Sequence, residues 1–329
     1  MTRPTITVGI PTFNRAALLR ETIESVLGQT YRDFSLIVSD NASTDETRDV
    51  VASLADSRLQ YVRAEENVGM IGNFNRLIGL AGTEFLMLLP DDDCLYPEYL
   101  GSVVEILQQN PSVGAVHTAF DEIDAETHVQ KHGVSYVTAK DPPLVEPGHA
   151  FLERSMTSTP ILFASTAYRT RAIRDAQGMT TREEPFADVP LFMRIALKWD
   201  FAYVDRPLAA FRVHDASVTK QLAPGGERAS DERDRLLTYG QIMFDRRIGF
   251  LDGAGLKSET TSRYRALATL RFVADRAGLG CPWWKSTTDF VRLLSLYPRI
   301  VVHPLAIRFC AAHLGGRSLR RAAQRVRSR

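Results

Sequence analysis

Residues 6–15 read ITVGIPTFNR, a short apolar run that passes directly into a polar loop. The run Ile6–Pro11 suits a strand buried on both faces, because such strands are apolar throughout instead of alternating. The next segment, Ala16–Leu27, carries Leu19, Ile23 and Val26 at helical spacing. Strand, polar loop and helix therefore follow one another at the start of the chain, as they do in α/β folds.

The same alternation continues through the first 120 residues. Further buried strands are predicted at Phe34–Ser39, Leu59–Arg63, Phe85–Leu89 and Val113–Thr118. Helices are predicted between them, one from a cap at Ser43 or Thr44 to Leu54 and one over Asn73–Ala81. Beyond a less regular middle, we expect a helix at Val189–Leu197 and a strand at Phe201–Phe211 broken at Pro207. The pattern predicts an α/β fold with a mainly parallel sheet and helices on both faces.

Composition is that of a soluble globular protein with a real core, since 44% of the residues are hydrophobic and 24% are charged. No run of eighteen apolar residues occurs, so we expect no transmembrane helix, and the first residues lack the features of a signal peptide. The 3 cysteines are too few and too scattered for a disulfide framework or a zinc cluster. This usage favours a reducing cytoplasm.

Charge divides the chain into two parts. Residues 1–262 hold 26 Lys and Arg against 37 Asp and Glu, whereas residues 263–329 hold 14 against 2. A linker is expected at residues 223–227 (APGGE), and the chain beyond it reads as helical. We therefore predict a first domain at 1–222, with halves at 1–120 and 121–222, followed by a basic helical extension at 223–329.

Polar residues follow three of the predicted strands, where ligands bind in open α/β sheets. Asp91, Asp92 and Asp93 come directly after the apolar run FLMLL. Adjacent carboxylates repel one another by roughly 1 kcal/mol per close pair even in water, and a divalent cation would remove that repulsion. Oxygen ligands of this kind suit Mg²⁺ or Mn²⁺ bound together with substrate phosphates. The alternative is a solvated acidic turn.

Four motifs in register resemble the family 2 glycosyltransferases of the GT-A fold, whose sheet is Rossmann-like and binds a nucleotide. They are IPTFNR at 10–15, SVLGQTY at 25–31, SDNASTDET at 39–47 and LPDDD at 89–93. The resemblance continues more weakly to about residue 220. It implies an inverting transferase of bacterial polysaccharide assembly, with a nucleoside-diphosphate sugar as donor.

The resemblance also implies site residues. The nucleotide-sugar contacts would be Pro11, Thr12, Asn14, Arg15, Asp40, Asn41, Asn67, Asn73, Asp91, Asp92 and Arg212. Among these, Asp40 would contact the base, and Asn41 stands where many members have a second acid. Asp91 and Asp93 match the DxD motif, whose last acid binds the metal, whereas Pro90 stands where an acid is common.

The family's catalytic base is the Asp of a Glu-Asp pair, which here reads Ala187-Asp188. Asp188 would take a proton from the acceptor hydroxyl, and an N-cap is the structural alternative for this residue. His214, in FRVHDASVT, resembles a late motif whose histidine completes the metal site in metal-dependent members. The metal set implied by the resemblance is Asp93 and His214.

Two other functions remain open. A sugar nucleotidyltransferase shares the sheet and a metal, but the loop after the first strand lacks the glycines expected of one. A catalytically inactive sugar- or nucleotide-binding scaffold is the second alternative, because Ala187 replaces the family's Glu. A dinucleotide oxidoreductase is disfavoured, since no G-x-G-x-x-G follows a strand.

The basic extension predicts a membrane partner. Trp283 and Trp284 precede an apolar stretch with interspersed arginines, and no acid follows Asp289. Segments of this composition are typical of helices that lie on the surface of an anionic membrane leaflet. We expect a protein peripheral to the cytoplasmic face of the membrane that acts on a lipid-linked glycan, and we do not expect nucleic-acid binding, because the body of the chain is acidic.

Overall fold

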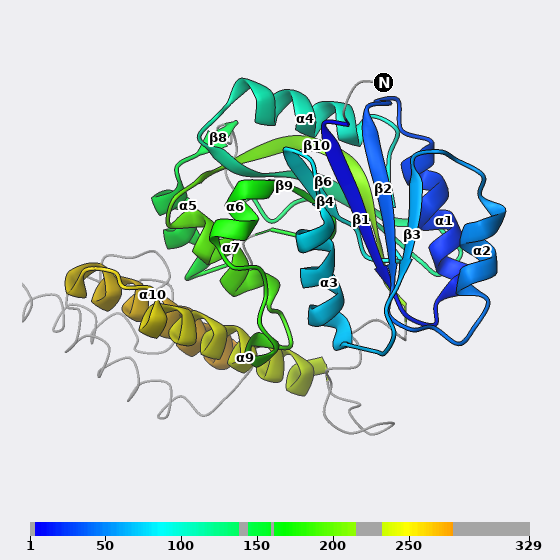
Figure 1. Cartoon of the computed structure of the whole chain (residues 1–329). Coiled ribbons are helices and arrows are strands. Elements are labelled where there is room, and N and C mark those ends of the chain that lie inside the picture. The colour runs from blue at the N-terminus through cyan, green and yellow to red at the C-terminus, as the bar shows by residue number, and fades with distance from the viewer. Residues whose placement is uncertain (1–3, 138–143, 159–160, 215–231, 279–329) are drawn as a thin grey trace, which may run out of the picture. The chain divides into compact units, whose positions relative to one another are not determined.

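The computed structural model describes residues 4–137, 144–158, 161–214 and 232–278 (Figure 1). The chain divides into two compact units. The first comprises Met1–Leu152 and Thr159–Asp215, and the second comprises Glu153–Ser158 and Ala216–Arg329. The domain boundary predicted after residue 222, and the linker predicted at 223–227, lie outside the described residues.

The first unit is built on one large sheet. Its strands in chain order are β1 Ile6–Thr12, β2 Phe34–Asp40, β3 Leu59–Arg63, β4 Phe85–Leu88, β5 Cys94–Leu95, β6 Val113–Ile123, β7 Val129–Val134, β8 Val145–Glu146, β9 Thr166–Arg169 and β10 Asp200–Arg212. They lie in the order β3-β2-β1-β4-β9-β6-β10-β5, with β7 beside β6 and β8 beside β10.

The sheet is mainly parallel, as the sequence predicts. β1 runs parallel to β2 and β4, β2 to β3, and β10 to β6. β9 runs antiparallel to both β4 and β6, which makes those two strands parallel to each other. The short strands β5, β7 and β8 add antiparallel pairs. The carboxyl ends of β1, β2, β3, β4, β6 and β10 therefore lie along the same edge.

The helices of the first unit connect these strands. They are α1 Ala16–Leu27, α2 Thr47–Ser53, α3 Gly69–Leu80, α4 Tyr99–Gln109, α5 Gly148–Ser155, α6 Thr170–Asp175 and α7 Asp188–Ala196, with short 3-10 turns at Phe163–Ser165 and Thr181–Glu183. The last three residues of α5 are grouped with the second unit.

Alternation along β1 shows that both faces of the sheet are covered. Ile6, Val8 and Ile10 are fully buried in a core that also contains Leu19 of α1 and Leu100 of α4. The intervening residues point to the other face, where a Cβ at Gly9 would lie 2.9 Å from the Leu77 side chain of α3. Gly9 is thus the position at which α3 approaches the sheet too closely for any side chain.

Four elements differ from the sequence prediction in their bounds. β6 continues past the predicted end at Thr118 to Ile123. α2 begins only at Thr47, because the Asp45 carboxylate accepts the Thr47 amide and hydroxyl protons and so holds the preceding segment as a loop. α3 begins at Gly69, four residues before the predicted start at Asn73, because Gly69 takes a φ of +77° at the turn. β10 continues past Pro207 through a shift in register instead of breaking there.

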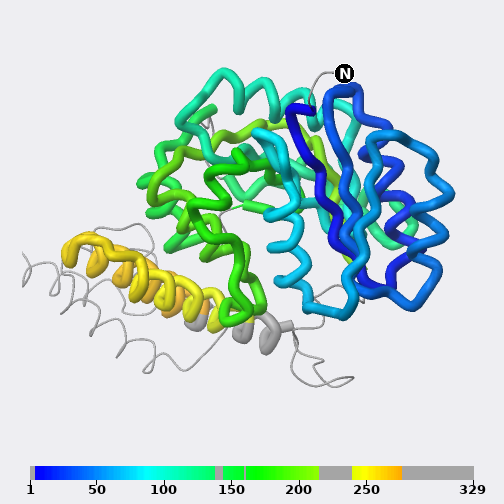
Figure 2. The backbone as a smooth tube through the Cα atoms, viewed as in Figure 1, coloured from blue at the N-terminus to red at the C-terminus, as the bar shows by residue number. Residues whose placement is uncertain are grey.

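The second unit contains the helical hairpin of α9 Glu232–Gly253 and α10 Ser258–Gly278. The two helices run side by side (Figure 2), and the Phe244 and Phe272 rings stack with centroids 4.6 Å apart. Arg247 is buried in this unit and donates to the carbonyl oxygens of Ser155 and Ser158. Within the described residues, helices therefore follow the sheet, as the sequence predicts. In the described part of the chain, no helix has the length and apolar character needed to cross a membrane.

Candidate functional site

The loops after β1, β2 and β4 meet at the carboxyl edge of the sheet. Thr12 and Asp40 are register partners at the ends of β1 and β2. The Asn41 amide donates to the Thr12 carbonyl at 2.9 Å, and the Leu89 amide donates to the Gly9 carbonyl at 3.0 Å. Pro11 and Thr12 are buried at this edge. The loops that carry the polar residues expected to form a site therefore begin next to one another.

The acidic loop, defined here as Asp91, Asp92 and Asp93, is enclosed by protein. Asp91 and Asp93 are buried, and burial raises the pKa of Asp91 to about 6 despite the opposing charge of Arg15. Burial, followed by the charge of Asp92, raises the pKa of Asp93 well above its usual value. The carboxyl groups of Asp91 and Asp93 therefore carry a penalty for ionisation, which a nearby cation relieves.

Arg15 supplies such a cation. Its Nη1 lies 2.7 Å from Asp92 Oδ2 and 3.2 Å from Asp91 Oδ1, so one nitrogen serves two carboxylates. Burial disfavours the charged guanidinium, but the charges of Asp91 and Asp92 outweigh that effect and raise the pKa of Arg15. The sequence prediction assigned Arg15 to the nucleotide, whereas the structure shows it on the acidic loop.

His214 also reaches this loop. Its Nε2 lies 3.0 Å from Asp92 Oδ2, and both side chains are largely buried. A carboxylate oxygen and an imidazole nitrogen at this separation fit a divalent ion such as Mn²⁺, for which both are ordinary ligands. The sequence prediction paired His214 with Asp93, but the carboxylate in contact with the ring belongs to Asp92.

Asp93 has a different environment, which Arg212 provides. The Arg212 backbone amide donates to Asp93 Oδ1 at 2.8 Å, and the Arg212 side chain is only 1% exposed. The guanidinium donates to acceptors on three segments: the Asp92 carbonyl, the Asp124 and Ala125 carbonyls with the Thr127 hydroxyl, and the Glu21 carboxylate. These bonds give Arg212 a positioning role at the acidic loop, and its predicted phosphate contact stays a prediction.

The Asp40 carboxylate is buried and fully engaged. Its Oδ1 accepts the Ser43 amide at 2.9 Å, while Oδ2 accepts the Tyr61 hydroxyl at 2.5 Å and lies 3.4 Å from Arg63 Nε. Burial, then the bond to Asp40, raises the pKa of Tyr61. Sequence reasoning missed Tyr61 and Arg63, although the parallel pairing of β2 with β3 sets Arg63 opposite Asp40.

The predicted asparagines hold loops in place. Asn41 donates to Asn67 Oδ1 at 2.7 Å and accepts the Val68 amide, which joins the end of β2 to the start of α3. Asn67 itself is exposed. Asn14 takes a φ of +53° and accepts the Thr44 amide.

Asn73 differs from the prediction most clearly. It is buried, its Oδ1 accepts the Ser39 hydroxyl at 2.6 Å, and its Nδ2 donates to the Ser39 carbonyl at 2.8 Å. Both ends of the amide are therefore bonded inside the protein, and Asn73 fixes α3 to β2.

Asp188 is the first residue of α7, and Ala187 is the N-cap. Backbone amides at Asp188 and Val189 bond the Asp188 carboxyl in the first turn of the helix, so the alternative capping role stays open beside the role as base. Although part of the residue remains accessible, burial raises the pKa of its carboxyl to about 6, against the opposing effect of nearby backbone amides. A carboxyl with this pKa is suited to accept a proton near neutral pH. Its negative charge, after the larger effect of burial, also raises the pKa of Tyr168.

The loop that leads into α7 is held by Arg194, which sequence reasoning missed. Its guanidinium contacts both Glu183 oxygens, at 2.5 and 3.1 Å, and donates to the Ala176 and Gly178 carbonyls. Asn75 of α3 bonds both the amide and the carbonyl of Met179. Glu183, an acid a few positions before Asp188, is thus committed to an ion pair.

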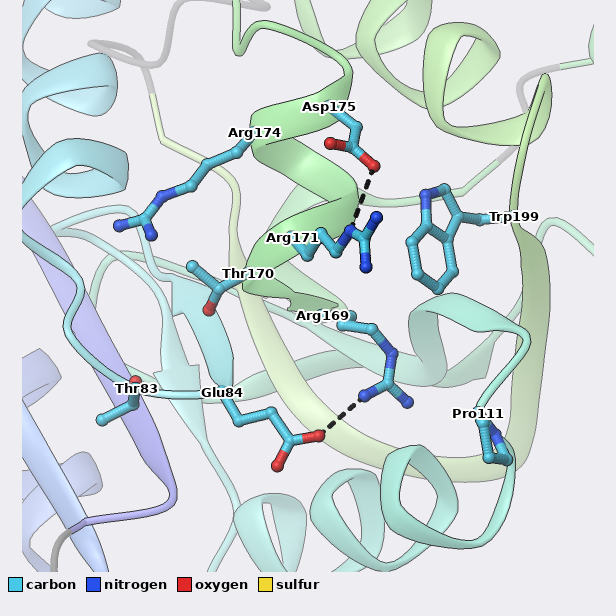
Figure 3. Close-up of a pocket in the computed structure, with 9 residues that line it drawn as sticks. All are labelled: Thr83, Glu84, Pro111, Arg169, Thr170, Arg171, Arg174, Asp175 and Trp199. Carbon is cyan, nitrogen blue, oxygen red and sulfur yellow. Dashed lines mark hydrogen bonds and ion pairs between the residues drawn. The ribbon is translucent and has the colours of Figure 1, made fainter.

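The protein also has a cavity of about 620 Å³ at the opposite edge of the sheet (Figure 3). Its lining includes Thr83 and Glu84 before β4, Pro111 before β6 and Trp199 before β10, so it lies at the amino ends of these strands. Arg169 and Arg174 also line it, but they donate to main-chain carbonyls. The cavity is therefore separate from the acidic loop.

An exposed cluster lies on the turn between β6 and β7. Ligand atoms of Asp124, Glu126 and His128 lie within 4.8 Å of one another. The Asp124 carboxylate accepts the amides of Glu126 and His128, as is usual for an aspartate in a turn. These bonds account for the arrangement without an ion.

Comparison with known proteins gives a consistent family signal. The model of glycosyl transferase family 2 matches residues 7–172. GalNAc(5)-diNAcBac-PP-undecaprenol beta-1,3-glucosyltransferase of Campylobacter jejuni is 37% identical over 117 residues, which cover 35% of this chain and 37% of that protein. Validoxylamine A glucosyltransferase of Streptomyces hygroscopicus is 40% identical over 105 residues, which cover 31% of this chain and 25% of that protein. The first curated relatives are matched over 35% to 49% of their own length.

Solved structures give the fold. TarS 1–349 of S. aureus, in complex with UDP-GlcNAc, aligns with a TM-score of 0.61 at 16% identity and covers 88% of this chain and 79% of that one. The mannosyltransferase PcManGT of Pyrobaculum calidifontis, in complex with GDP-Man and Mn²⁺, aligns with a TM-score of 0.56 at 16% identity, covering 99% and 88%. The predicted GT-A architecture is confirmed by these neighbours.

Proposed function

Since the chain belongs to glycosyl transferase family 2, we propose that it transfers a sugar from a nucleoside-diphosphate sugar to a hydroxyl group of a glycan. One observation carries the proposal, namely the meeting of Arg15, His214 and the acidic loop at the carboxyl edge of the sheet. That edge is where ligands bind in open α/β sheets. The buried aspartate that opens α7 adds a group able to accept a proton.

The proposed reaction is a single displacement with inversion. Asp188 takes the proton of the acceptor hydroxyl, and the freed oxygen forms a bond to the anomeric carbon of the donor sugar. The bond from that carbon to the diphosphate oxygen breaks at the same time, and the nucleoside diphosphate leaves with the electron pair. A base with a pKa of about 6 is largely ionised at neutral pH yet still basic enough to accept the proton.

We assign the divalent cation to Asp92 and His214. Their contact at 3.0 Å makes them the best matched oxygen and nitrogen ligands at the acidic loop, and such a mixed pair favours Mn²⁺ over Mg²⁺. Asp93 is assigned no direct contact with the ion, since one of its oxygens accepts the Arg212 amide. Its role is to hold the acidic loop in place. When bound, the ion would neutralise negative charge on the diphosphate.

The donor pocket is proposed at the ends of β1, β2 and β3. Asp40, buried at the end of β2 and bonded to Tyr61, and Asn67, exposed before α3, are its proposed contacts. Two structural neighbours were solved with UDP-GlcNAc and GDP-Man, which supports a nucleoside-diphosphate sugar as the class of donor.

The acceptor is proposed to be lipid-linked. The relative from C. jejuni is named for an undecaprenol-diphosphate glycan, which supports this class. We propose that residues 1–222 catalyse the transfer, and that the basic extension at 223–329 holds the protein on the cytoplasmic face of an anionic membrane. Trp283, Trp284 and the arginines that follow lie outside the described residues. Sedimentation with anionic and neutral vesicles, comparing the full chain with one that ends at Gly280, tests this, and equal partitioning of both chains would contradict it.

Incubation with a panel of nucleotide sugars, with and without Mn²⁺, tests the main proposal. We expect Mn²⁺-dependent release of nucleoside diphosphate, faster with a glycan acceptor. Release of pyrophosphate from a nucleoside triphosphate and a sugar phosphate would instead identify a nucleotidyltransferase. Binding of nucleotide sugars without any turnover would identify an inactive scaffold.

A further inference from the structure

We propose that Arg15 is an exchangeable counter-ion of the acidic loop. In this proposal a divalent cation that binds Asp92 displaces the guanidinium, which then binds the phosphates of the donor. The first half concerns the protein and the ion alone, whereas the second half rests on the proposed function.

Competition follows from a shared oxygen atom. Arg15 Nη1 lies 2.7 Å from Asp92 Oδ2, and His214 Nε2 lies 3.0 Å from the same oxygen. A cation held between Asp92 and His214 therefore uses the oxygen that Arg15 contacts most closely. Because the ion and the guanidinium are both positive, they also repel each other at this distance. The structure thus favours either cation at Asp92, but not both together.

The two arginines at the loop differ in their freedom to move. Arg212 is 1% exposed, and its bonds to Glu21 and to several main-chain carbonyls fix it. The Arg15 side chain is 30% exposed, and in the described residues it bonds to the protein only through Nη1. Displacing Arg15 therefore breaks two contacts of one nitrogen, whereas moving Arg212 would disrupt three segments at once.

The donor provides a natural new partner for a displaced guanidinium. Arginine binds phosphate oxygens through paired N–H groups, and Nε and Nη2 of Arg15 are not used by the described protein. A diphosphate also brings negative charge next to the ion, which relieves the repulsion between the two cations. The ion and the nucleotide are then expected to bind cooperatively, so that each increases the affinity of the protein for the other.

The test compares Mn²⁺ affinity in three proteins, measured by electron paramagnetic resonance without nucleotide. Arg15→Gln removes the competing charge, so we expect Mn²⁺ to bind about tenfold more tightly than in the wild type, the scale of repulsion between partly buried like charges. Arg20→Gln is the matched control. It removes the same charge from α1 at an exposed position bonded to Ser53, and its Mn²⁺ affinity is expected to equal that of the wild type.

Calorimetry with UDP and GDP at saturating Mn²⁺ tests the second half. Arg15→Gln is expected to bind the nucleotide that the wild type binds at least tenfold more weakly, because the phosphates lose a guanidinium partner. The two effects of Arg15→Gln therefore have opposite signs, because the variant binds the ion more tightly and the nucleotide more weakly. A role of Arg15 in merely holding the carboxylates in place would weaken both.

Each outcome decides one part of the proposal. Unchanged or weaker Mn²⁺ binding in Arg15→Gln overturns the exchange, and tighter Mn²⁺ binding with unchanged nucleotide affinity overturns the transfer to phosphate. Failure of the wild type to bind either nucleotide refutes the proposed function but leaves the Mn²⁺ comparison valid. If Arg15→Gln does not fold, a crystal structure of the wild type with Mn²⁺ and the bound nucleotide decides the matter, since a guanidinium still on Asp92 excludes the exchange.

Discussion

Replacement of Asp188 by asparagine should abolish activity and stabilise the protein at neutral pH. The substitution keeps the size of the side chain but removes its charge and its affinity for a proton. Loss of a general base lowers turnover by about 10²- to 10⁴-fold. The stability effect follows from burial, which raises the pKa of this carboxyl from 3.8 to about 6.

The magnitude comes from linkage between proton binding and folding. The folded state binds the Asp188 proton more tightly than the unfolded chain, so this stabilisation is present below about pH 4 and is lost as the pH rises through 6. A shift of about two units corresponds to roughly 3 kcal/mol, which the ionised aspartate costs the folded state at neutral pH. Asparagine avoids that cost. The difference in free energy of unfolding between Asp188→Asn and the wild type should fall by roughly half between about pH 7.5 and about pH 5.

Two measurements check this prediction. Urea unfolding of both proteins at the two pH values gives the difference in free energy of unfolding, and release of nucleoside diphosphate gives turnover. The wild-type kcat/KM should decline below about pH 6, as the base becomes protonated. Asp175→Asn serves as the control, since this side chain is partly exposed on α6 and pairs with Arg171. Near-wild-type turnover in Asp188→Asn, or an acid limb centred near pH 4, would refute the reasoning.

Three further predictions concern the acidic loop, Arg212 and the loop before α7. Asp92→Asn should weaken Mn²⁺ binding at least tenfold and remove Mn²⁺-dependent transfer while leaving the circular dichroism spectrum unchanged, since a carboxylate ligand is lost; retained Mn²⁺ affinity would place the ion elsewhere. Arg212→Met should lower the free energy of unfolding by about 1.5 kcal/mol or more, because it removes a buried guanidinium whose bonds to the Asp92 carbonyl and the Glu21 carboxylate join separate segments, and a loss below about 0.5 kcal/mol in urea unfolding would contradict the positioning role. Gly178→Ala should destabilise more than Gly133→Ala, since both have φ near +63° but only the Cβ at 178 would lie 2.4 Å from the Asn75 amide oxygen; equal thermal shifts would show that the contact relaxes freely.

The sequence was sufficient for the parallel strands of the sheet because their signals are local, whereas the antiparallel strands β5, β7, β8 and β9 were not predicted. The apolar runs at β1 and β4 predict buried strands within a residue of their observed bounds, and the polar residues that follow lie at the carboxyl edge, as expected. The start of α2 was harder to predict, because a hydrogen bond to the Asp45 side chain competes with the helix there.

The pairing of side chains within the site was not accessible from local patterns. The contact of Arg15 with Asp92 spans 77 positions and that of His214 with Asp92 spans 122. Polarity alone did not distinguish an inward amide such as Asn73 from an outward one such as Asn67, since packing of α3 on β2 decides which is buried. The residue types were therefore predictable, whereas their partners required the fold.

The bond from the Arg212 amide to Asp93 has a consequence for the order in which the chain assembles. The two residues are 119 positions apart, and Arg212 is the last residue of β10. As the polypeptide leaves the ribosome, the segment matched by the family model, residues 7–172, is complete before that partner has been synthesised. Until β10 pairs with β6, the buried carboxyl of Asp93 has neither its amide donor nor the guanidinium that closes the loop. A fragment that stops at residue 172 would carry every aspartate of the acidic loop and still lack the strand that shapes it, so excision at the family boundary should yield a sheet without a working centre.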